Sequence, residues 1–323
     1  MKVMLLAAGE GTRFKPHTLK LPKPSLPLLN VPLAFYALEV LQEFGSIDLI
    51  VNTFHLPEKI VETFETTRTY LNSLNFSHEK KLLGSGGGLW QAKKYFSNEE
   101  DFILMNADEV ILSHHAGQLQ KAYEQHRSSK ALSTLVVMDH PEVGTKFGGV
   151  WLNSKNQVIG FGKTRPIDAK NGYHFIGLQF LSKKIFQYLP DGESNILLNA
   201  VMNGINSNEK VQIFKMQAHW FETGNLQDYL LATDQCLRLL GEEKNSILSN
   251  ITKKFAANSL LEKTAQGTFF IDKTARVQKN QLSGFAVIGA NVKIDECVKI
   301  KNSVIGPGAV LSGQKEVTSE LIL

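Results

Sequence analysis

The sequence has few cysteines and no long apolar run. The first argues against a disulfide-stabilised protein and the second against a membrane-spanning one. Cys236 and Cys297 are the only cysteines among 323 residues, and they form no C-x-x-C pair. We therefore expect reduced, structural thiols in a cytoplasmic protein. No apolar stretch approaches the roughly 18 residues that a membrane span requires, so no membrane partner is expected. Met1 and Lys2 lead directly into a strand-like segment, so we also expect no signal peptide.

A strong excess of one sign of charge is also missing. The formal net charge is +4, and no basic run has the length expected of a nucleic-acid-binding patch, so no nucleic-acid partner is expected. A mildly positive chain suits a small anionic substrate. The hydrophobic fraction of 43% and the charged fraction of 20% are typical of a globular protein, and the length allows one large and one small domain.

Apolar segments of strand length alternate with helical patterns through the first two-thirds of the chain. Strands are expected at Lys2–Ala7, Asp48–Asn52, Asp101–Asn106, Ser133–Met138 and Gln212–Met216. Helices are expected at Ala34–Phe44, Pro57–Leu74, Gly88–Tyr95 and Ala116–His126. The alternation predicts an α/β fold in which helices wrap a Rossmann-like, mainly parallel sheet, and such sheets bind ligands beyond the carboxyl ends of their strands.

Two further helical patterns set the expected domain boundaries. Asn225–Gly241 has the pattern of a helix that closes the large domain, and Lys244–Leu261 the pattern of a helical connector. We therefore expect a large domain at 1–241, a connector at 242–265 and a separate C-terminal segment at 266–323.

A glycine-rich turn follows the first expected strand. Residues 6–13 read Leu-Ala-Ala-Gly-Glu-Gly-Thr-Arg, and a lysine between two prolines follows at 22–24. Glycines let backbone N–H groups approach anionic oxygens, and arginine and lysine supply positive charge. A dinucleotide fingerprint is excluded because Phe14 stands where its third glycine would be, and the Gly-Lys-Ser/Thr end of a P-loop is absent. The pattern predicts a polyphosphate site of another kind.

The full run from Leu6 to Pro24 resembles the N-terminal signature of the sugar-1-phosphate nucleotidyltransferases, and the resemblance covers nearly the whole chain. These enzymes join a nucleoside triphosphate and a sugar-1-phosphate and release pyrophosphate. The resemblance implies that Arg13 binds the β- and γ-phosphates, that Lys23 lies between the two reacting phosphates, and that both are catalytic. It implies nucleotide contacts for Leu6, Ala7, Ala8, Gly9, Gly11, Thr12 and Arg13.

Three downstream motifs extend the implied site. Glu79 and the glycine-rich run at 83–88 match the family's base and ribose loop, which adds the nucleotide contacts Glu79, Gly84, Ser85 and Gly86. Asp108 ends an apolar strand, and Glu222 stands where the family has the aspartate of Trp-x-Asp-x-Gly-Thr. The resemblance makes Asp108 catalytic and assigns Asp108 and Glu222 to Mg²⁺, the one cofactor expected. The extra methylene of the glutamate is a departure that shifts the carboxylate.

The sugar side departs further from the family pattern. Lys163 matches the lysine that contacts the sugar phosphate and is implied to be catalytic, whereas Gly162 replaces the glutamate that usually holds sugar hydroxyls. His174 has a second interpretation as a packed or surface histidine. Asn195 and Asn199 lie in a helix-like segment that could face the sugar. The implied sugar contacts are Asn106, Gly149, Lys163, His174 and Gly177.

The last part of the chain changes character. Residues 287–294 and 304–310 repeat an Ile-Gly-x-x-x-Val pattern, which resembles the hexapeptide repeat of left-handed parallel β-helices. Two or three coils are too few to stand alone, because each coil buries its core against a neighbour. We therefore expect this segment to dock on the large domain or on a partner subunit, which would give a homo-oligomer. An irregular β tail is the alternative interpretation.

The combined resemblance is strongest to mannose-1-phosphate guanylyltransferases, whose members pair such a base loop with a β-helix tail. GTP and mannose-1-phosphate are thus the expected substrates, in nucleotide-sugar synthesis for cell-envelope polysaccharide. One alternative is a uridylyltransferase for N-acetylglucosamine- or N-acetylmuramate-1-phosphate, and thymidylyl and choline-phosphate cytidylyl relatives are others. A non-catalytic paralogue that binds a nucleotide sugar is a further alternative. Gly162 and Glu222 fit that last interpretation, whereas Lys23, Asp108 and Lys163 argue against it.

Overall fold

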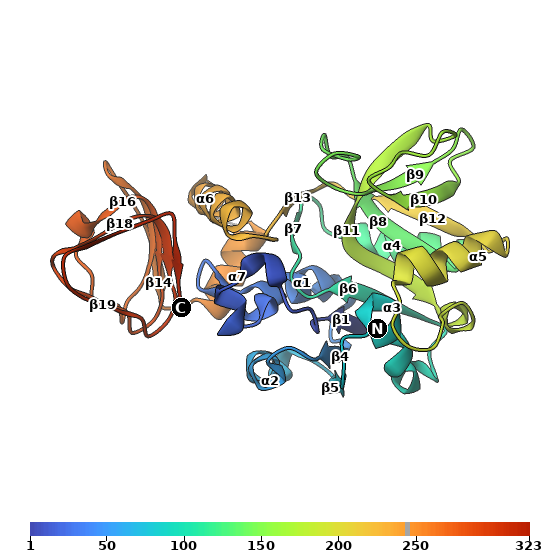
Figure 1. The fold of residues 1–323 in the computed structure, drawn as a ribbon, viewed down its shortest axis with the longest axis horizontal. Coiled ribbons are helices and arrows are strands. Elements are labelled where there is room, and N and C mark those ends of the chain that lie inside the picture. The colour runs from blue at the N-terminus through green and yellow to red at the C-terminus, as the bar shows by residue number, and fades with distance from the viewer. Residues whose placement is uncertain (243–245) are drawn as a thin grey trace. The chain divides into compact units, whose positions relative to one another are not determined.

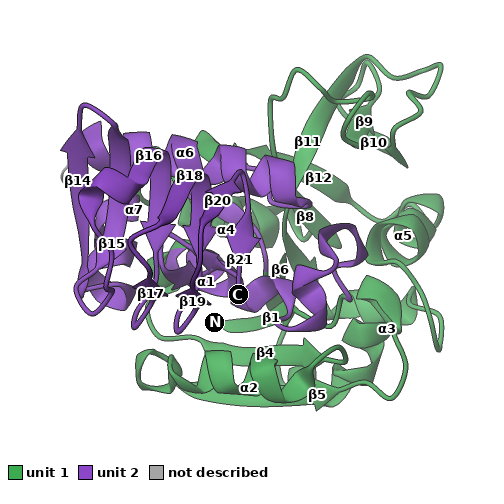
Figure 2. Cartoon of the chain, turned by 60° about the vertical axis from the view of Figure 1, so that its left-hand side comes forward, with its two compact units in different colours: residues 1–9, 40–107, 113–220 green, residues 10–39, 108–112, 221–323 purple. Residues whose placement is uncertain are grey.

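The computed structural model describes residues 1–242 and 246–323. They form two compact units, each assembled from separate stretches of chain (Figure 2). Because the chain passes repeatedly between the units, this division differs from the consecutive one expected at 241 and 265. Within the described ranges, no helix combines the length and the apolarity needed to cross a bilayer. Unit 1 comprises Met1–Gly9, Val40–Ala107 and Ser113–Trp220, and unit 2 comprises Glu10–Glu39, Asp108–Leu112 and Phe221–Leu323.

Unit 1 is built on a nine-stranded sheet (Figure 1). Its strands are β1 Lys2–Leu6, β4 Asp48–Thr53, β5 Ser73–His78, β6 Asp101–Asn106, β8 Ser133–Met138, β9 Gly149–Leu152, β10 Val158–Gly162, β11 Asn171–Ser182 and β12 Val211–Lys215. The hydrogen-bonded order is β10-β9-β11-β6-β1-β4-β5, and β8 pairs with β11 and β12. Residues 3–5 of the central strand β1 are apolar and fully buried, which is typical of a strand covered on both faces.

The sheet is parallel from β6 through β1 and β4 to β5, and mixed in the rest, where β12 runs parallel to β8. β1 runs parallel to β4 and β6, and β4 runs parallel to β5, as the strand–helix alternation predicted. The long strand β11 runs antiparallel to β6, β8 and β9, so the expectation of a mainly parallel sheet describes only part of it. The pairing of β11 with β8 shifts register between Phe175 and Gln179, and Gly177 between them has a φ of 75°. This irregularity bends β11 beside the end of β6.

Helices α2 (Pro57–Glu65), α3 (Gly84–Gln91), α4 (Gln118–Ser129) and α5 (Met202–Asn206) belong to unit 1, and a π-helical segment at Ile196–Val201 precedes α5. The prediction of one helix over Pro57–Leu74 is wrong. Helix α2 ends at Glu65, because Thr66 and Thr67 donate side-chain hydrogen bonds to the carbonyls of Thr63 and Phe64 at distances of 2.7 Å. This frees the following residues to form β5.

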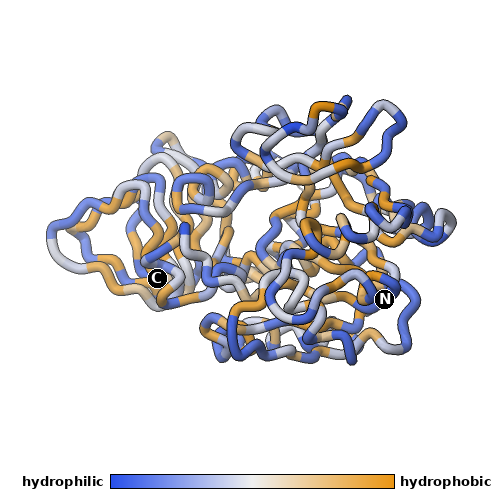
Figure 3. The backbone as a smooth tube through the Cα atoms, turned by 45° about the vertical axis from the view of Figure 1, so that its right-hand side comes forward, coloured by the Kyte–Doolittle hydropathy of each residue, from blue (hydrophilic) through white to orange (hydrophobic). Residues whose placement is uncertain are grey.

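The core of unit 1 lies between its sheet and helix α3. Three rings pack there, with centroid separations of 4.3 Å for Phe96 and Phe102 and 5.7 Å for Phe102 and Phe186. Figure 3 shows hydrophobic stretches of the chain alternating with hydrophilic ones, as expected of buried strands joined by surface loops. Cys236 in unit 2 is also buried, which raises the pKa of its thiol, and both Cys236 and Cys297 are free.

Unit 2 holds the hairpin of β2 (Pro27–Leu28) and β3 (Val31–Pro32) and the helices α6 (Leu226–Glu242) and α7 (Ile247–Phe255). Helix α1 (Leu33–Leu41) and strands β7 (Val110–Ser113) and β13 (Ala218–Phe221) lie where the chain passes between the units. The Tyr229 hydroxyl of α6 donates a hydrogen bond to the Pro27 carbonyl, and its ring meets the Phe14 ring edge-on at 5.5 Å. These contacts tie residues 10–39 to α6.

The expected helical connector at 242–265 is only partly helical. Residues 243–245 lie outside the described residues, and 247–255 form α7. Residues 259–264 are instead strand β14 (Ser259–Thr264), which pairs antiparallel with β15 (Gly267–Asp272). The prediction of a helix continuing to Leu261 is therefore wrong, and β14 belongs with the C-terminal strands.

The C-terminal strands pair mostly in parallel. They are β15, β16 (Leu282–Ile288), β17 (Lys293–Ile294), β18 (Val298–Ile305), β19 (Val310–Leu311), β20 (Lys315–Thr318) and β21 (Leu321–Ile322). Ile271 pairs with Ile288, Ile288 with Ile305, and Ile305 with Ile322, at the same interval along the chain each time. This isoleucine ladder runs through a separate apolar core that includes Val298. The repeating pattern seen in the sequence therefore corresponds to stacked parallel strands.

Candidate functional site

The end of β1 is fixed by a chain of buried hydrogen bonds in unit 1. The Ala7 N–H donates to Asn52 Oδ1 at 2.7 Å, and Asn52 Nδ2 donates to Glu79 Oε1 at 2.7 Å. The Leu83 N–H donates to Glu79 Oε2 at 2.9 Å, so both carboxylate oxygens have donors. Burial raises the pKa of Glu79, and these two hydrogen bonds oppose that shift. Glu79 is 1% exposed, and its hydrogen bonds join Asn52 at the end of β4 to Leu83. Both carboxylate oxygens are therefore used within the protein, and the nucleotide contact of Glu79 stays a prediction.

The glycine-rich start of α3 packs against residues 192–196. A Cβ on Gly84 would lie 2.6 Å from the Ser194 carbonyl oxygen, and one on Gly87 would lie 2.3 Å from the Gly192 carbonyl oxygen. Hydrogen bonds follow the same contact: the Ser194 N–H donates to the Leu83 carbonyl at 2.9 Å, and the Gly86 N–H donates to the Ser194 carbonyl at 2.8 Å. The glycines thus allow close backbone approach, which a ligand interpretation alone does not explain.

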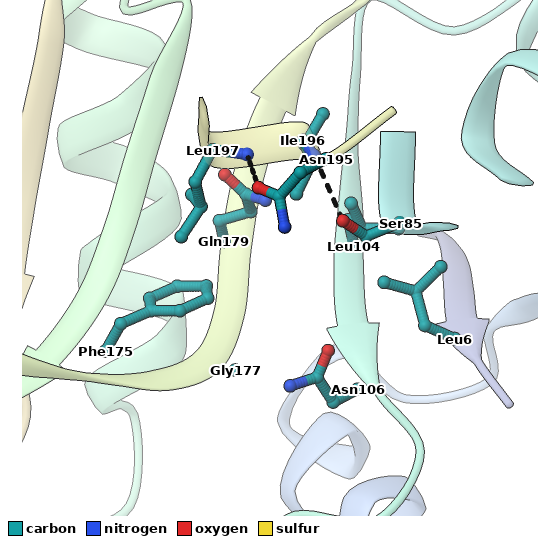
Figure 4. A pocket seen from close by; sticks show the side chains of 10 residues that line it. All are labelled: Leu6, Ser85, Leu104, Asn106, Phe175, Gly177, Gln179, Asn195, Ile196 and Leu197. Carbon is teal, nitrogen blue, oxygen red and sulfur yellow. Dashed lines mark hydrogen bonds between the residues drawn. The ribbon is translucent and has the colours of Figure 1, made fainter. Parts of the chain in front are cut away.

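A pocket of about 200 Å³ opens in unit 1 at the carboxyl ends of β1 and β6 (Figure 4). Four of the predicted site residues lie together on its wall: Leu6, Ser85, Asn106 and Gly177. None of the described side chains that line it carries a charge. The full lining is Leu6, Ser85, Leu104, Asn106, Phe175, Gly177, Gln179, Asn195, Ile196 and Leu197.

The pocket also contains residues that the sequence did not assign. Phe175 and Gln179 flank Gly177 on β11, and the register shift of that strand brings both to the pocket. Gln179 is 1% exposed, and its Oε1 accepts a hydrogen bond from the Ser133 hydroxyl at 3.1 Å. Side chains two residues apart on a strand point to the same face, so a strand through Gly177 could have indicated Phe175 and Gln179 from the sequence. The other unassigned wall residues are Leu104, Ile196 and Leu197, while Asn195 carried only a weak signal.

Three other predicted sugar-side residues lie together but do not line this pocket. Gly149 on β9 pairs with Gly162 on β10 and with His174 on β11. Lys163 follows β10 directly and is exposed. The Trp151 indole N–H donates to the Gly162 carbonyl at 2.8 Å, which fixes the backbone next to Lys163. The structure therefore groups Gly149, Lys163 and His174 at one corner of the sheet.

His174 is buried in a cluster of rings. Its centroid lies 4.2 Å from Trp220, 5.0 Å from Phe147 and 5.6 Å from His140. Within the described residues neither of its ring nitrogens has a hydrogen-bond partner. Burial, with a smaller contribution from His140, lowers the pKa of His174 to about 4, so the ring is neutral near pH 7. This environment matches the packed-histidine interpretation, while the predicted sugar contact of His174 stays a prediction.

A group of charged side chains lies in unit 2, which we call the charged cluster: Arg13, Lys23, Asp108 and Glu222. Lys23 Nζ lies 2.6 Å from Asp108 Oδ2, and both side chains are partly buried. Lys23 is the first residue of the 3-10 turn Lys23–Ser25. It is flanked by Pro22 and Pro24, so its backbone is stiff. The Thr223 hydroxyl donates to the Asp108 carbonyl at 3.3 Å and links Asp108 to the segment that carries Glu222.

Arg13 and Glu222 meet at Gly224. A Cβ on Gly224 would lie 2.1 Å from Glu222 Oε1 and 2.9 Å from a guanidinium nitrogen of Arg13. A side chain at that position would therefore displace both charged groups. Thr12 and Arg13 lie in a 3-10 turn that begins after Gly11, whose φ is 60°. Ala8 and Gly9 complete the loop between β1 and this turn.

The charged cluster offers two carboxylates to a cation. Aspartate and glutamate oxygens are ligands that Mg²⁺ prefers, and such sites use one or two carboxylates together with substrate phosphates. Asp108 and Glu222 meet that requirement in kind and number. Among residues 1–242 and 246–323, no group of three or more His, Cys, Asp or Glu could hold a metal by itself. The donor set therefore fits a cation shared with a phosphate ligand.

Comparison with known proteins gives a consistent result. The model of the family described as nucleotidyl transferase matches residues 2–238. The chain is 26% identical to the UTP–glucose-1-phosphate uridylyltransferase of Synechocystis sp., covering 96% of this chain and 86% of that protein. It is 26% identical to the mannose-1-phosphate guanyltransferase of Schizosaccharomyces pombe, covering 82% and 72%. It is 23% identical to the glucose-1-phosphate thymidylyltransferase of Streptomyces griseus, covering 100% and 92%.

Solved structures agree at the level of the fold. The UDP-glucose pyrophosphorylase from Acinetobacter baumanii superposes with a TM-score of 0.61 at 20% identity, over 79% of this chain and 99% of that chain. At this identity the likeness concerns the mixed α/β architecture alone.

Proposed function

The chain belongs to the nucleotidyl transferase family, and we propose that it transfers a nucleoside monophosphate from a nucleoside triphosphate to a sugar-1-phosphate. The oxygen of the sugar phosphate attacks the α-phosphorus, a new P–O bond forms, and the bond from the α-phosphorus to the bridging oxygen breaks. Pyrophosphate leaves with that oxygen. The transfer needs no covalent enzyme intermediate, so the protein contributes positioning and charge neutralisation.

The observation that carries this proposal is the charged cluster. Lys23 and Asp108, 85 residues apart in the chain, lie 2.6 Å apart. In the proposed reaction, the Lys23 ammonium neutralises oxygens of the reacting phosphates, and Arg13 binds the β- and γ-phosphates with its planar fork. Lys163, exposed beside β10, contacts the phosphate of the sugar. The backbone from Leu6 to Gly11 receives the nucleotide.

Mg²⁺ is part of the proposal. Asp108 and Glu222 are the residues that would hold it, in keeping with the carboxylate donors of the charged cluster. When bound, the ion neutralises negative charge on phosphate oxygens during the transfer.

For the substrate pair we propose GTP and mannose-1-phosphate. The match to a mannose-1-phosphate guanyltransferase over 82% of the chain supports this pair. The equally similar relative that uses UTP and glucose-1-phosphate supports a uridylyltransferase as the second candidate, and that candidate includes N-acetylglucosamine- and N-acetylmuramate-1-phosphate as substrates. We also propose that 266–323 form a short left-handed β-helix that joins subunits, an idea supported by the isoleucine ladder.

Pyrophosphate release tests the proposal directly. Four nucleoside triphosphates are combined with mannose-, glucose-, N-acetylglucosamine- and N-acetylmuramate-1-phosphate, with Mg²⁺ and with EDTA as a control. Release with GTP and mannose-1-phosphate above all other pairs, abolished by EDTA, is the expected result. Preferred release with UTP selects the second candidate. Absence of turnover with every pair, together with measurable binding of a nucleotide sugar, would falsify the enzymatic proposal in favour of a non-catalytic paralogue.

A further inference from the structure

Asn195 lies on the wall of the pocket in a conformation that the protein itself fixes. Its Oδ1 accepts hydrogen bonds from the Leu197 N–H at 2.9 Å and the Leu198 N–H at 3.0 Å. Its own N–H donates to Asn199 Oδ1 at 2.7 Å. Two backbone donors require an oxygen opposite them, so the assignment of oxygen and nitrogen in this amide follows from chemistry. The Nδ2 group is then directed away from the helical segment and toward the pocket (Figure 4).

The segment that carries Asn195 is clamped to α3. The Ile196 N–H donates to the Ser85 hydroxyl at 3.0 Å, next to the two bonds that join Ser194 to Leu83 and Gly86. Gly84 and Gly87 allow this approach, because a Cβ on either would meet the backbone of residues 192–194. The glycine-rich motif therefore fixes the position of Asn195, and a donor held in this way binds an acceptor with little loss of side-chain entropy.

Asn195 is exposed, and among the described residues its Nδ2 group has no acceptor from the protein, so this group is open to an acceptor from a ligand. We propose that Asn195 is a specificity residue, which donates a hydrogen bond from Nδ2 to a neutral oxygen of the sugar ring bound in this pocket. The proposal rests on the proposed function, since it names the part of the substrate that the pocket receives.

The lining of the pocket defines the class of sugar. Its wall carries no cation to pair with a carboxylate and no anion to pair with an ammonium group, and burying a charge without a counter-charge is costly. Its volume of about 200 Å³ is below the range of roughly 300–1,000 Å³ typical of sites for drug-sized ligands, so it admits one ring rather than a whole nucleotide sugar. Phe175 and Leu104 supply apolar surface for the C–H face of that ring. A neutral hexose or N-acetylhexosamine fits, whereas N-acetylmuramate does not.

A nucleobase carbonyl is also a neutral acceptor oxygen, and the experiment separates the two sources. Asn195→Asp keeps an oxygen for the Leu197 and Leu198 N–H groups, since aspartate caps helices as well as asparagine does, but it replaces the Nδ2 donor by a second oxygen. Asn199→Asp is the matched control. It introduces the same charge four residues away, keeps the acceptor for the Asn195 N–H, and does not alter the pocket lining.

We expect Asn195→Asp to raise the KM for the sugar-1-phosphate at least about tenfold at saturating nucleoside triphosphate, with kcat within about threefold and the thermal midpoint unchanged. Asn199→Asp is expected to remain within about twofold of the wild type in all three. A rise confined to the KM for the nucleoside triphosphate assigns the acceptor to the base and overturns the sugar assignment. A change of less than about twofold in both KM values overturns the role of Asn195 altogether.

Calorimetric titration with GDP-mannose and UDP-glucose separates this proposal from the proposed function. If the wild type binds a nucleotide sugar without turnover, the enzymatic proposal fails, yet Asn195→Asp must still weaken that binding at least about tenfold relative to Asn199→Asp. Equal affinities of the two variants would contradict the specificity role even in an active enzyme.

Discussion

The pocket of unit 1 is lined by neutral amides, a hydroxyl and apolar side chains, whereas the charged cluster of unit 2 consists of two cations and two carboxylates. The two regions also differ in how they are held. Asn195 in the pocket is positioned by backbone hydrogen bonds, and Lys23 in the cluster by flanking prolines and an ion pair. A neutral pocket selects by shape and hydrogen bonds, while a charged cluster binds and activates phosphate groups. The difference predicts that substitutions in the cluster change turnover and substitutions in the pocket change substrate affinity.

The strongest test of this difference removes either partner of the central ion pair. Lys23→Ala and Asp108→Asn are each expected to lower kcat on the order of 100-fold, because in the proposed function Lys23 neutralises phosphate oxygens and Asp108 would hold Mg²⁺. The KM for the sugar-1-phosphate is expected to change far less. Steady-state pyrophosphate release measures both constants.

Lys15→Ala is the control for Lys23→Ala, since Lys15 is an exposed lysine of the same segment. It is expected to keep the wild-type kcat. Wild-type turnover in both ion-pair variants would remove Lys23 and Asp108 from the catalytic site.

The next test disturbs the scaffold of the pocket and leaves the charged cluster untouched. In Gly87→Ala the new Cβ would lie 2.3 Å from the Gly192 carbonyl oxygen, so residues 192–196 must move and Asn195 with them. We expect the KM for the sugar-1-phosphate to rise about tenfold, which corresponds to roughly 1.4 kcal/mol of binding. Gly160→Ala serves as the control for an added methyl group, because Gly160 has no positive φ and its Cβ would meet only a Pro166 carbon, at an ordinary contact distance of 3.4 Å. An unchanged KM in Gly87→Ala would mean that the clamp does not position the pocket wall.

The strands that have a parallel partner in the sheet were largely predictable. Asp101–Asn106 and Ser133–Met138 have the predicted bounds, because each is a short apolar run bounded by polar residues. Ser73–His78 was missed, since Leu74 continues the apolar spacing of the preceding helix. Nothing in the residue types shows that the Thr66 and Thr67 hydroxyls donate to the carbonyls of Thr63 and Phe64. The antiparallel pairing of β11 could not be predicted from the sequence either, because strand direction and register depend on partners far along the chain.

The charged cluster and the pocket also differ in how much of each could be predicted from the sequence. Lys23 and Asp108 were assigned from the resemblance, and the structure brings them together as charged neighbours. The glycines at 84–88 were interpreted as a surface for a ligand, whereas much of their role is contact with Ser194. A single sequence shows that glycine is present but not which distant segment requires it. The contact between these glycines and Ser194 is what positions Asn195 on the wall of the pocket.

A third prediction concerns the stability of unit 1 at low pH, where the buried and neutral His174 ring resists protonation. The unfolded pKa of His174 is 6.5 and the folded pKa is about 4, so the unfolded state binds the proton more tightly. Stability is therefore fully present above pH 6.5 and declines as the pH falls toward 4. His174→Phe keeps a ring beside Phe147 and Trp220 and removes the titration. We expect its thermal midpoint to fall less than that of the wild type between pH 8 and pH 5, by an amount corresponding to about 1 to 2 kcal/mol.

Circular dichroism melts at pH 8, 6 and 5 measure the difference, and taking the change with pH cancels any constant packing effect of the larger ring. His78→Gln, at an exposed histidine of β5, is the control and should follow the wild type. Parallel pH curves for the wild type and His174→Phe would show that the buried histidine does not couple unfolding to protonation.

The smallest expected effect concerns how the C-terminal strands hold the segment that carries Lys23. Asn30 occupies the second position of the two-residue turn between β2 and β3, with a φ of 58°, and its Nδ2 donates to the Ser259 hydroxyl and the Ile288 carbonyl, each at 3.0 Å. Asn30→Gly preserves the turn, because glycine tolerates positive φ, but removes both bonds. The loss is expected to be about 0.5 to 1 kcal/mol, since the Asn30 Oδ1 that also disappears is buried and has no partner among the residues that the structure describes.

Asn156→Gly isolates that side-chain contribution. Asn156 has a φ of 57° and is exposed, so its replacement reports only the backbone effect of glycine. Urea denaturation of both variants should place Asn30→Gly below Asn156→Gly, and light scattering checks that the subunit number is unchanged. If the two variants lose the same stability, the hydrogen bonds to the isoleucine ladder do not restrain the Lys23 segment. The stiffness of the charged cluster would then come from the prolines at 22 and 24 alone, and the contrast with the hydrogen-bonded pocket would become sharper.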